Sequence, residues 1–293
     1  MQKNKISAFI TADGELIDIT GEGKRVIIAE KDERIITKKQ IEHIKREKQR
    51  REDLTDFVWV RFQYNQPLYP RIKPNIVARM FCLATHTNKD GFTATKQNIR
   101  VILNGINDGA ITELINSMNE QGIMIPEKGG KHRVNRDCFY RGDMDECGEN
   151  HIRLFTSATR MLYCSLKPTE QCYMAYIMQM IPFVNRQTNI LCHNQIEQSI
   201  EHTEYMKLKN FCEIMGLDVT HTSRIRKQLL KLRINGELAV GFFNDVDSME
   251  LVHNGKYVVV NPSLYYGGER KKEYHTKVCK LFETEKQQLK QVQ

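Results

Sequence analysis

Residues 220–236 read THTSRIRKQLLKLRING, and this stretch decides the predicted fold. Ile225 and Leu229 recur at helical spacing and predict a helix that runs to Leu232 with one buried stripe. Asn235-Gly236 is typical of the left-handed turn that closes such a helix. A shorter helical pattern and a glycine turn precede this segment, and two apolar strands flank a polar tip after it. The order helix, turn, helix, hairpin predicts a winged helix-turn-helix.

The same order of patterns occurs once before, about 115–125 residues earlier. An apolar helix is predicted over 76–84, two more helices over 95–103 and 107–120, and a hairpin over 123–135. A repeat at this scale indicates duplicated domains. We therefore expect a mostly α fold with small β (α+β), in which two tandem winged helix-turn-helix domains follow a small β element and a basic helix.

The chain has 293 residues, enough for about two domains of roughly 150 residues each. The predicted parts are an N-terminal β element and basic helix over 1–56, a first winged-helix domain over 57–150, a second over 151–269, and a charged C-terminal tail over 270–293. In the first part, β-type runs at 6–10, 16–19 and 26–29 are separated by turn residues. Residues 38–53 are expected to form either a phosphate-contacting arm or a solvated helix.

Lysine and arginine number 44 against 36 acidic residues, so the formal net charge is +8. This excess favours a polyanionic partner, either nucleic acid or an anionic membrane. No apolar run approaches the roughly 20 residues that span a bilayer, and no secretory signal is evident, so we expect no membrane partner and a cytoplasmic location. The eight cysteines include no C-x-x-C pair, and we expect reduced thiols, no metal and no cofactor.

The predicted recognition helix of the second copy carries polar and cationic side chains between its buried positions. Such side chains suit a helix that enters the major groove, about 12 Å wide, and contacts bases and phosphates. Arg224 or Lys227 is the first choice for reading guanine, and the alternative is a basic surface that is merely solvated. The predicted DNA-binding residues of this helix are His221, Thr222, Ser223, Arg224, Arg226, Lys227 and Lys231.

The matching helix of the first copy has the opposite character. It carries Asn107, Asp108, Glu113, Asn116 and Glu120, without any lysine or arginine. Phosphates would repel its carboxylates. We therefore predict that the second copy reads DNA, while the first packs, dimerises or binds a protein.

Further predicted contacts lie outside this helix. Lys256 near the second hairpin tip and the run Arg270-Lys271-Lys272 are placed to contact flanking phosphates, or are simply solvated. In the tail, Val278, Leu281 and Leu289 have roughly helical spacing, which indicates either a dimerising helix or a frayed end.

The block 209–268, which includes Asn235-Gly236 and the closing residues YVVVNPSLYYGG (257–268), resembles RepL-type replication initiators of Gram-positive plasmids and phages. Those are winged-helix proteins of MarR-like geometry. The stretch 57–142, which includes Phe57-Val58-Trp59, Ala84-Thr85 and Phe139-Tyr140-Arg141-Gly142, resembles helix-turn-helix proteins encoded by phages. The resemblance implies DNA binding by residues 221–231 near a replication origin or a promoter.

Most catalytic motifs tested are missing. Neither the His-apolar-His of a rolling-circle nuclease nor the G-x-x-x-x-G-K-[ST] loop of an ATPase occurs. His221-x-x-Arg224 with Tyr257 or Tyr265 matches the bare spacing of a tyrosine recombinase, but a helix-turn-helix explains the same residues. An acidic cluster is either a magnesium site or a polar linker: Asp143, Asp145, Glu146 and Glu149. We expect no enzymatic activity.

The sequence thus predicts a sequence-specific double-stranded DNA-binding protein of a phage or plasmid. The first expectation is a replication initiator that binds origin repeats as a homodimer and recruits a host replication protein. One alternative is a transcriptional regulator of a mobile element, acting as repressor or activator with a host transcription protein. Another is a protein-interaction adaptor whose acidic first copy docks on a host enzyme.

Overall fold

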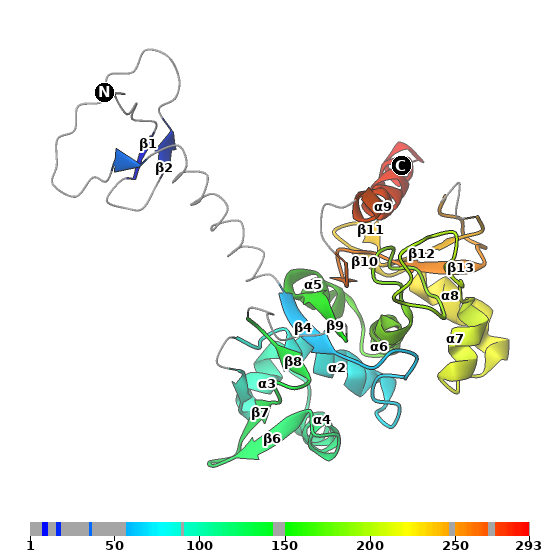
Figure 1. Ribbon diagram of the computed structural model, residues 1–293. Helices are drawn as coiled ribbons and strands as arrows, with labels where there is room; N and C mark the ends of the chain where they lie inside the picture. The colour runs from blue at the N-terminus through cyan, green and yellow to red at the C-terminus, as the bar shows by residue number, and fades with distance from the viewer. Residues whose placement is uncertain are drawn as a thin grey trace. The chain divides into compact units, whose positions relative to one another are not determined.

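The computed structural model describes residues 57–88, 91–142, 150–245, 250–268 and 273–292, with side chains to 283 in the last range, and three short strands before them (Figure 1). The chain divides into two compact units, Met1–Thr55 and Asp56–Gln293. In the first unit an antiparallel sheet has the order β2-β1-β3, formed by β1 (Ala8–Ile10), β2 (Leu16–Asp18) and β3 (Ile35–Ile36). The predicted strand at 26–29 and basic helix at 38–53 lie outside the described residues.

A four-stranded antiparallel sheet joins distant parts of the second unit. Its strands, in the order β14-β9-β4-β8, are β14 (Tyr265–Tyr266), β9 (His151–Phe155), β4 (Phe57–Arg61) and β8 (Phe139–Tyr140). β4 and β9 pair from Phe57 opposite Phe155 to Arg61 opposite His151. Val58 and Val60 point to the core and are fully buried, as the alternation of side chains along a strand requires.

The first helical segment lies between β4 and β8 in the chain. Its elements are α2 (Pro74–Ala84), β5 (Thr93–Ala94), α3 (Lys96–Ile102), α4 (Asp108–Glu120), β6 (Met124–Glu127) and β7 (Lys131–Val134). The helices begin where local chemistry favours it: α2 has a proline in its first turn, and Thr95 and Asn107 cap α3 and α4 by accepting backbone N–H bonds. β7 lies between β5 and β6.

The second helical segment lies between β9 and β14. Its helices are α5 (Thr156–Ser165), α6 (Gln171–Gln179), α7 (Leu208–Ile214) and α8 (Thr222–Leu229), with short 3-10 turns η1 (Ile181–Phe183) and η2 (Val219–His221). The strands β12 (Val240–Phe243) and β13 (Tyr257–Val260) form the hairpin that follows α8. Ile190 makes an isolated bridge to Val259, on the other side of β13 from β12.

Asn235 and Gly236 correct one local prediction. They do not close α8, which already ends at Leu229. Both have positive φ, 54° and 84°, and form the two-residue loop of a small hairpin between β10 (Arg233–Ile234) and β11 (Glu237–Leu238). A tight hairpin loop favours positive φ at both central positions, and Asn-Gly is its preferred pair. The dipeptide therefore marks a β-turn.

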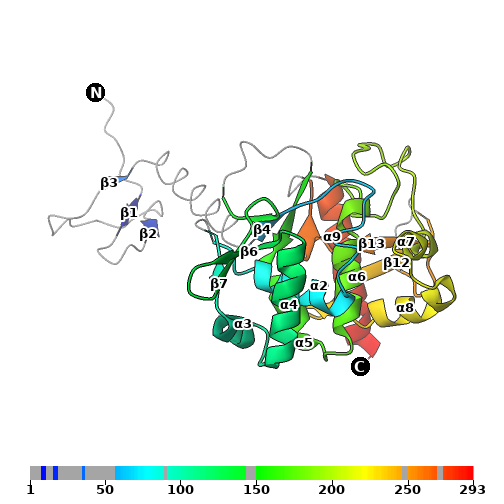
Figure 2. The ribbon, with the colours of Figure 1, turned by 90° about the horizontal axis from the view of Figure 1, so that it is seen from below.

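The core of the second unit centres on α2 and α6, which pack side by side (Figure 2). Every residue of α2 from Ile76 to Ala84 is buried. Phe81 of α2 meets Phe139 of β8 edge to face at 5.5 Å between ring centroids, and the Tyr265 hydroxyl of β14 donates to the Ile177 carbonyl of α6 at 3.0 Å. These contacts fix the four-stranded sheet to both helices.

The first half of α9 (Glu273–Val292) is buried in a second apolar cluster of this unit. Val278 and Phe282 are buried against a cluster of apolar side chains, Ile190, Leu238, Phe243 and Val259, and Leu281 packs beside them. Up to Glu283 the apolar stripe is therefore covered by the chain itself, so here it is neither a frayed end nor a seam left for a second helix. The side chain of Leu289 lies outside the described residues.

The expected architecture, mostly α with two tandem winged helix-turn-helix domains, is wrong. The protein is mixed α/β, with several antiparallel sheets. One of those sheets takes strands from both sides of the expected boundary between 150 and 151, and α2 packs on α6 across the same boundary. Helical periodicity reports each segment alone, and it does not reveal that Phe57–Arg61 pairs with a strand some ninety residues later.

Candidate nucleic-acid interface

α8 is held to the second unit by a narrow apolar stripe. Ile225 is nearly buried and Leu229 fully buried, as the sequence predicted for these positions. The turn before the helix is fixed by Asp218, whose carboxylate accepts bonds from the Thr220 hydroxyl (2.7 Å) and amide (2.9 Å). These bonds hold the pKa of Asp218 below its ordinary value. The start of α8 is therefore well defined.

The face of α8 opposite this stripe, and the turn after the helix, carry exposed cations. Ser223, Arg224 and Lys227 are exposed on α8, where their spacing places them on one face of the helix, and Lys231 is exposed in the turn two residues after the helix ends. We call Arg224, Lys227 and Lys231 the α8 cations. Within the part of the chain that the structure describes, none of the three forms a salt bridge. Arg224 also lies near Cys172 of α6, where burial raises the pKa of the thiol and the arginine charge opposes that rise.

Three predicted residues of this region have different surroundings. Arg226 is half-buried, and its guanidinium lies over the Phe242 ring of β12, 5.3 Å from the centroid. Thr222 donates its hydroxyl to the Val219 carbonyl at 2.7 Å, so it serves the helix start. His221 is exposed, with Nδ1 3.9 Å from Asp218 Oδ2. Of the three, only His221 lies openly at the surface.

Of the four predicted flanking cations, the structure describes one. Lys256 is exposed just before β13, where its amide donates to the Asn244 side chain at 3.1 Å. Arg270, Lys271 and Lys272 lie outside the described residues. Lys207, which the sequence reasoning missed, is exposed and forms an isolated bridge opposite Tyr257, the neighbour of Lys256. No local pattern marks Lys207, because its position depends on a pairing fifty residues away.

The first helical segment places α4 on the other side of the α2–α6 pair from α8 (Figures 1 and 2). Two of its three carboxylates are paired, Asp108 with Arg100 of α3 and Glu113 Oε1 with Lys73 Nζ at 2.6 Å, and the exposed Glu120 forms no salt bridge with a described residue. In addition, Lys96 Nζ contacts the Thr112 hydroxyl at 3.4 Å. The acidic face predicted from α4 alone is thus largely compensated by cations from neighbouring elements.

The β6–β7 hairpin carries cations that the sequence reasoning also passed over. Lys128 and Lys131 are exposed on either side of Gly129-Gly130, whose φ values of 74° and 69° form the turn. Arg133 is paired with Glu127 at 3.1 Å across the hairpin. The Lys-Gly-Gly-Lys pattern could have predicted these exposed cations, since a glycine turn between two lysines places both side chains at the surface.

The recombinase spacing does not assemble into a site around Tyr265. That side chain is completely buried, its hydroxyl donates to Ile177, and burial raises its pKa well above the ordinary value. Tyr257 packs its ring among Tyr205 and Phe243. The described residues hold no group of three or more metal-ligating side chains, and the acidic residues 143–149 lie outside them.

Comparisons of this chain with protein-family models, with curated proteins and with solved structures find no match. The resemblance to RepL-type initiators therefore stays a prediction from the sequence. Among the described residues, no helix has the length and apolar character needed to cross a membrane.

Proposed function

We propose that this protein binds double-stranded DNA through the α8 cations. The observation that carries the proposal is that Arg224 and Lys227 on one face of α8, and Lys231 in the turn after it, are exposed and form no salt bridge with any described residue. Cations that are not neutralised within the protein favour a polyanion, because each phosphate contact releases counterions from the DNA. The paired charges of α4 offer no such gain.

The proposed contacts follow from the position of each side chain. Arg224 lies near the start of α8 and reads a guanine edge, while Lys227 and Lys231 contact phosphates. Ser223 and His221 are exposed at the same end of the helix and supply further hydrogen bonds. Lys256, together with Lys207, contacts backbone beside the main site. Arg226 mainly braces α8 against β12.

In this proposal the protein is a cytoplasmic, sequence-specific DNA-binding protein of a phage or plasmid, acting without catalysis. Its role is that of a replication initiator, which binds origin repeats as a homodimer and recruits a host protein. A transcriptional regulator of a mobile element would use the same DNA contacts. Selection of bound genomic fragments separates the two roles, because the enriched site would lie at origin repeats in one case and over a promoter in the other.

The test is fluorescence anisotropy with a duplex selected from random sequence and a scrambled duplex of the same composition. The full chain is compared with the triple variant Arg224→Gln, Lys227→Gln, Lys231→Gln. We expect the plot of log affinity against log salt to lose a slope of about 0.9 for each lost phosphate contact. The matched control, Lys167→Gln, removes an exposed cation between α5 and α6 and should leave affinity unchanged. Equal affinity of the triple variant and the full chain would overturn the proposal.

A further inference from the structure

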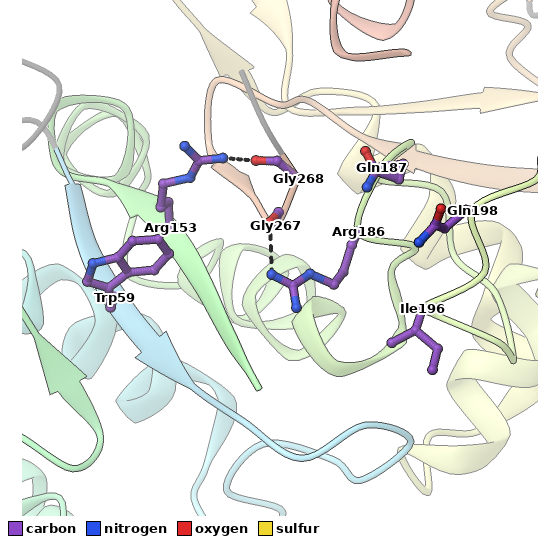
Figure 3. Close-up of a pocket in the computed structure, with 8 residues that line it drawn as sticks. All are labelled: Trp59, Arg153, Arg186, Gln187, Ile196, Gln198, Gly267 and Gly268. Carbon is purple, nitrogen blue, oxygen red and sulfur yellow. Dashed lines mark hydrogen bonds between the residues drawn. The ribbon is translucent and has the colours of Figure 1, made fainter. Parts of the chain in front are cut away.

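The partly exposed aromatic side chains of the second unit differ in what covers them. Trp59 lines a cavity of about 370 Å³ between the four-stranded sheet and the loop after η1 (Figure 3). The Arg153 guanidinium lies over the Trp59 ring, 5.9 Å from its centroid. Arg153 and Arg186 also bond the carbonyls of Gly268 and Gly267. The side chains of this cavity therefore already contact one another and the backbone.

Two tyrosines of α6 have different surroundings. Tyr173 and Tyr176 lie about one turn apart, and both are half-buried. Their rings meet edge to face, with centroids 6.0 Å apart and an interplanar angle of 75°. A contact of this geometry covers at most one face of the Tyr173 ring. Among the residues that the structure describes, no cation lies over either ring.

The tyrosine pair lies beside the start of α8, which packs against α6 (Figure 2). Burial raises the pKa of the Tyr176 phenol, and the neighbouring thiols of Cys172 and Cys212 add to the rise. Cys212 of α7 forms a hydrogen bond with Thr222, the first residue of α8, and Cys172 lies near Arg224. The two rings are therefore next to the end of α8 that carries Arg224.

An aromatic ring beside a DNA-binding helix offers a second kind of contact. Aromatic side chains stack on the faces of bases with little sequence preference. Within a duplex both faces of a base are stacked on neighbouring base pairs, so a protein reaches only the edges in the grooves. The Tyr173 ring can therefore stack on a base only where the strand is unpaired.

We propose that Tyr173 stacks on an unpaired base of DNA whose adjacent duplex is held by the α8 cations. The protein then binds partly opened DNA in preference to a continuous duplex. Tyr176 is a positioning residue, because it contacts the Tyr173 ring from one side. This inference rests on the proposed function, since the α8 cations hold the strand beside the ring. It adds a contact that they do not supply, because a phosphate contact positions the protein without reading the bases.

The test is fluorescence anisotropy with the selected duplex and with the same duplex carrying a short unpaired stretch at either edge of the site. We expect the full chain to bind one of the opened DNAs about tenfold more tightly, since a stacked base contributes about 1–3 kcal/mol. Tyr173→Leu should abolish this preference, whereas Tyr173→Phe keeps the ring and should retain it. The matched control, Tyr274→Leu, replaces a half-buried tyrosine of α9 and should leave the preference unchanged. Equal affinity of the full chain for all these DNAs, or a preference retained by Tyr173→Leu, would overturn the proposal.

The salt dependence separates this proposal from the proposed function. Tyr173→Leu should leave the salt slope unchanged because it removes no phosphate contact, whereas the triple α8 variant should lower the slope on every DNA. If the triple variant binds the duplex as well as the full chain does, the proposed function fails. If it binds the duplex more weakly but the full chain does not prefer opened DNA, only the stacking contact fails.

A measurement on the full chain alone decides where Tyr173→Leu lowers the melting temperature. The unpaired stretch is made with 2-aminopurine at each position in turn, because the emission of this base falls when it stacks. We expect binding of the full chain to lower the emission at one position of the preferred DNA. If binding lowers the emission at none of the unpaired positions, no base is stacked and the proposal is overturned.

Discussion

α4 and α8 occupy similar places in their segments, since each follows a short helix and precedes a hairpin, yet their surfaces differ in charge. Both bury an apolar stripe: Ile111, Leu114, Ile115 and Met118 in α4, and Ile225 and Leu229 in α8. Two of the three carboxylates of α4, Glu113 and Asp108, are paired with Lys73 and Arg100, whereas the α8 cations have no such partner among the described residues. A similar buried pattern therefore supports two different surfaces, and the function must be argued from the surface.

The two segments also differ in how they are braced. α9 lies against the second segment, and Phe282 is fully buried there beside Phe243 and Val259. We expect Phe282→Ala to lower the free energy of unfolding by about 3–5 kcal/mol, because a large buried ring leaves a cavity. Urea unfolding of the full chain measures this. Tyr274→Ala on the same helix, where the side chain is only half-buried, is the control and should cost less. A loss below about 1 kcal/mol for Phe282→Ala would mean that α9 is not part of the core.

The second prediction separates base reading from phosphate contact on α8. Arg224→Gln should lower affinity for the selected duplex about ten- to a hundredfold and affinity for the scrambled duplex much less, since a bidentate arginine–guanine contact contributes about 1–3 kcal/mol of discrimination. Lys227→Gln should weaken both duplexes alike and lower the salt slope by about 1. Anisotropy titrations on both duplexes give the four affinities. Equal losses on both duplexes for Arg224→Gln would assign this side chain to the phosphates instead.

The buried faces of α4 and α8 could be predicted from sequence because they depend on spacing alone. Ile225 and Leu229 are buried as their spacing indicated, and Ile111 and Leu114, which have helical spacing in the helix predicted over 107–120, are buried too. Exposure of Arg224 and Lys227 on the far side of α8 follows from the same spacing. Short-range signals of this kind need only a few neighbouring residues.

The arrangement of the segments could not be predicted in this way, because it depends on contacts between distant residues. The pairing of Trp59 with Arg153 has no local signature, and neither does the ion pair of Lys73 with Glu113. Asn235-Gly236 shows a different limit: one dipeptide suits both a helix end and a tight β-turn, and only the pairing of Ile234 with Glu237 distinguishes them. Because contacts between distant residues could not be predicted, the sequence indicated two domains where the structure has one unit with a shared sheet.

The third prediction tests whether Arg226 contacts DNA or stabilises the packing of α8 on β12. Its guanidinium lies over the buried Phe242 ring, and a cation–π contact of this kind contributes about 0.5–1 kcal/mol. Arg226→Gln should therefore lower the free energy of unfolding by about that amount. The salt slope for DNA should change less than with Lys227→Gln. Chemical unfolding and anisotropy on the same samples test both parts, and a salt slope that falls as far as with Lys227→Gln would place Arg226 among the DNA contacts.

The smallest expected effect concerns the paired charges of α4. Asp108→Asn with Glu113→Gln removes two carboxylates and leaves Arg100 and Lys73 without these partners. Because exposed salt bridges contribute roughly 0–1 kcal/mol, the free energy of unfolding should fall by less than about 1 kcal/mol. Affinity for scrambled duplex should rise about twofold at low salt and return to that of the full chain at high salt, since freed surface cations attract phosphates only over the Debye length. The contrary outcome is a gain in affinity for this variant as large as the loss in affinity for the triple α8 variant. In that case the ion pairs of the α4 carboxylates would prevent the first segment from binding DNA. The difference between the two helices would then depend on those ion pairs and not on α8.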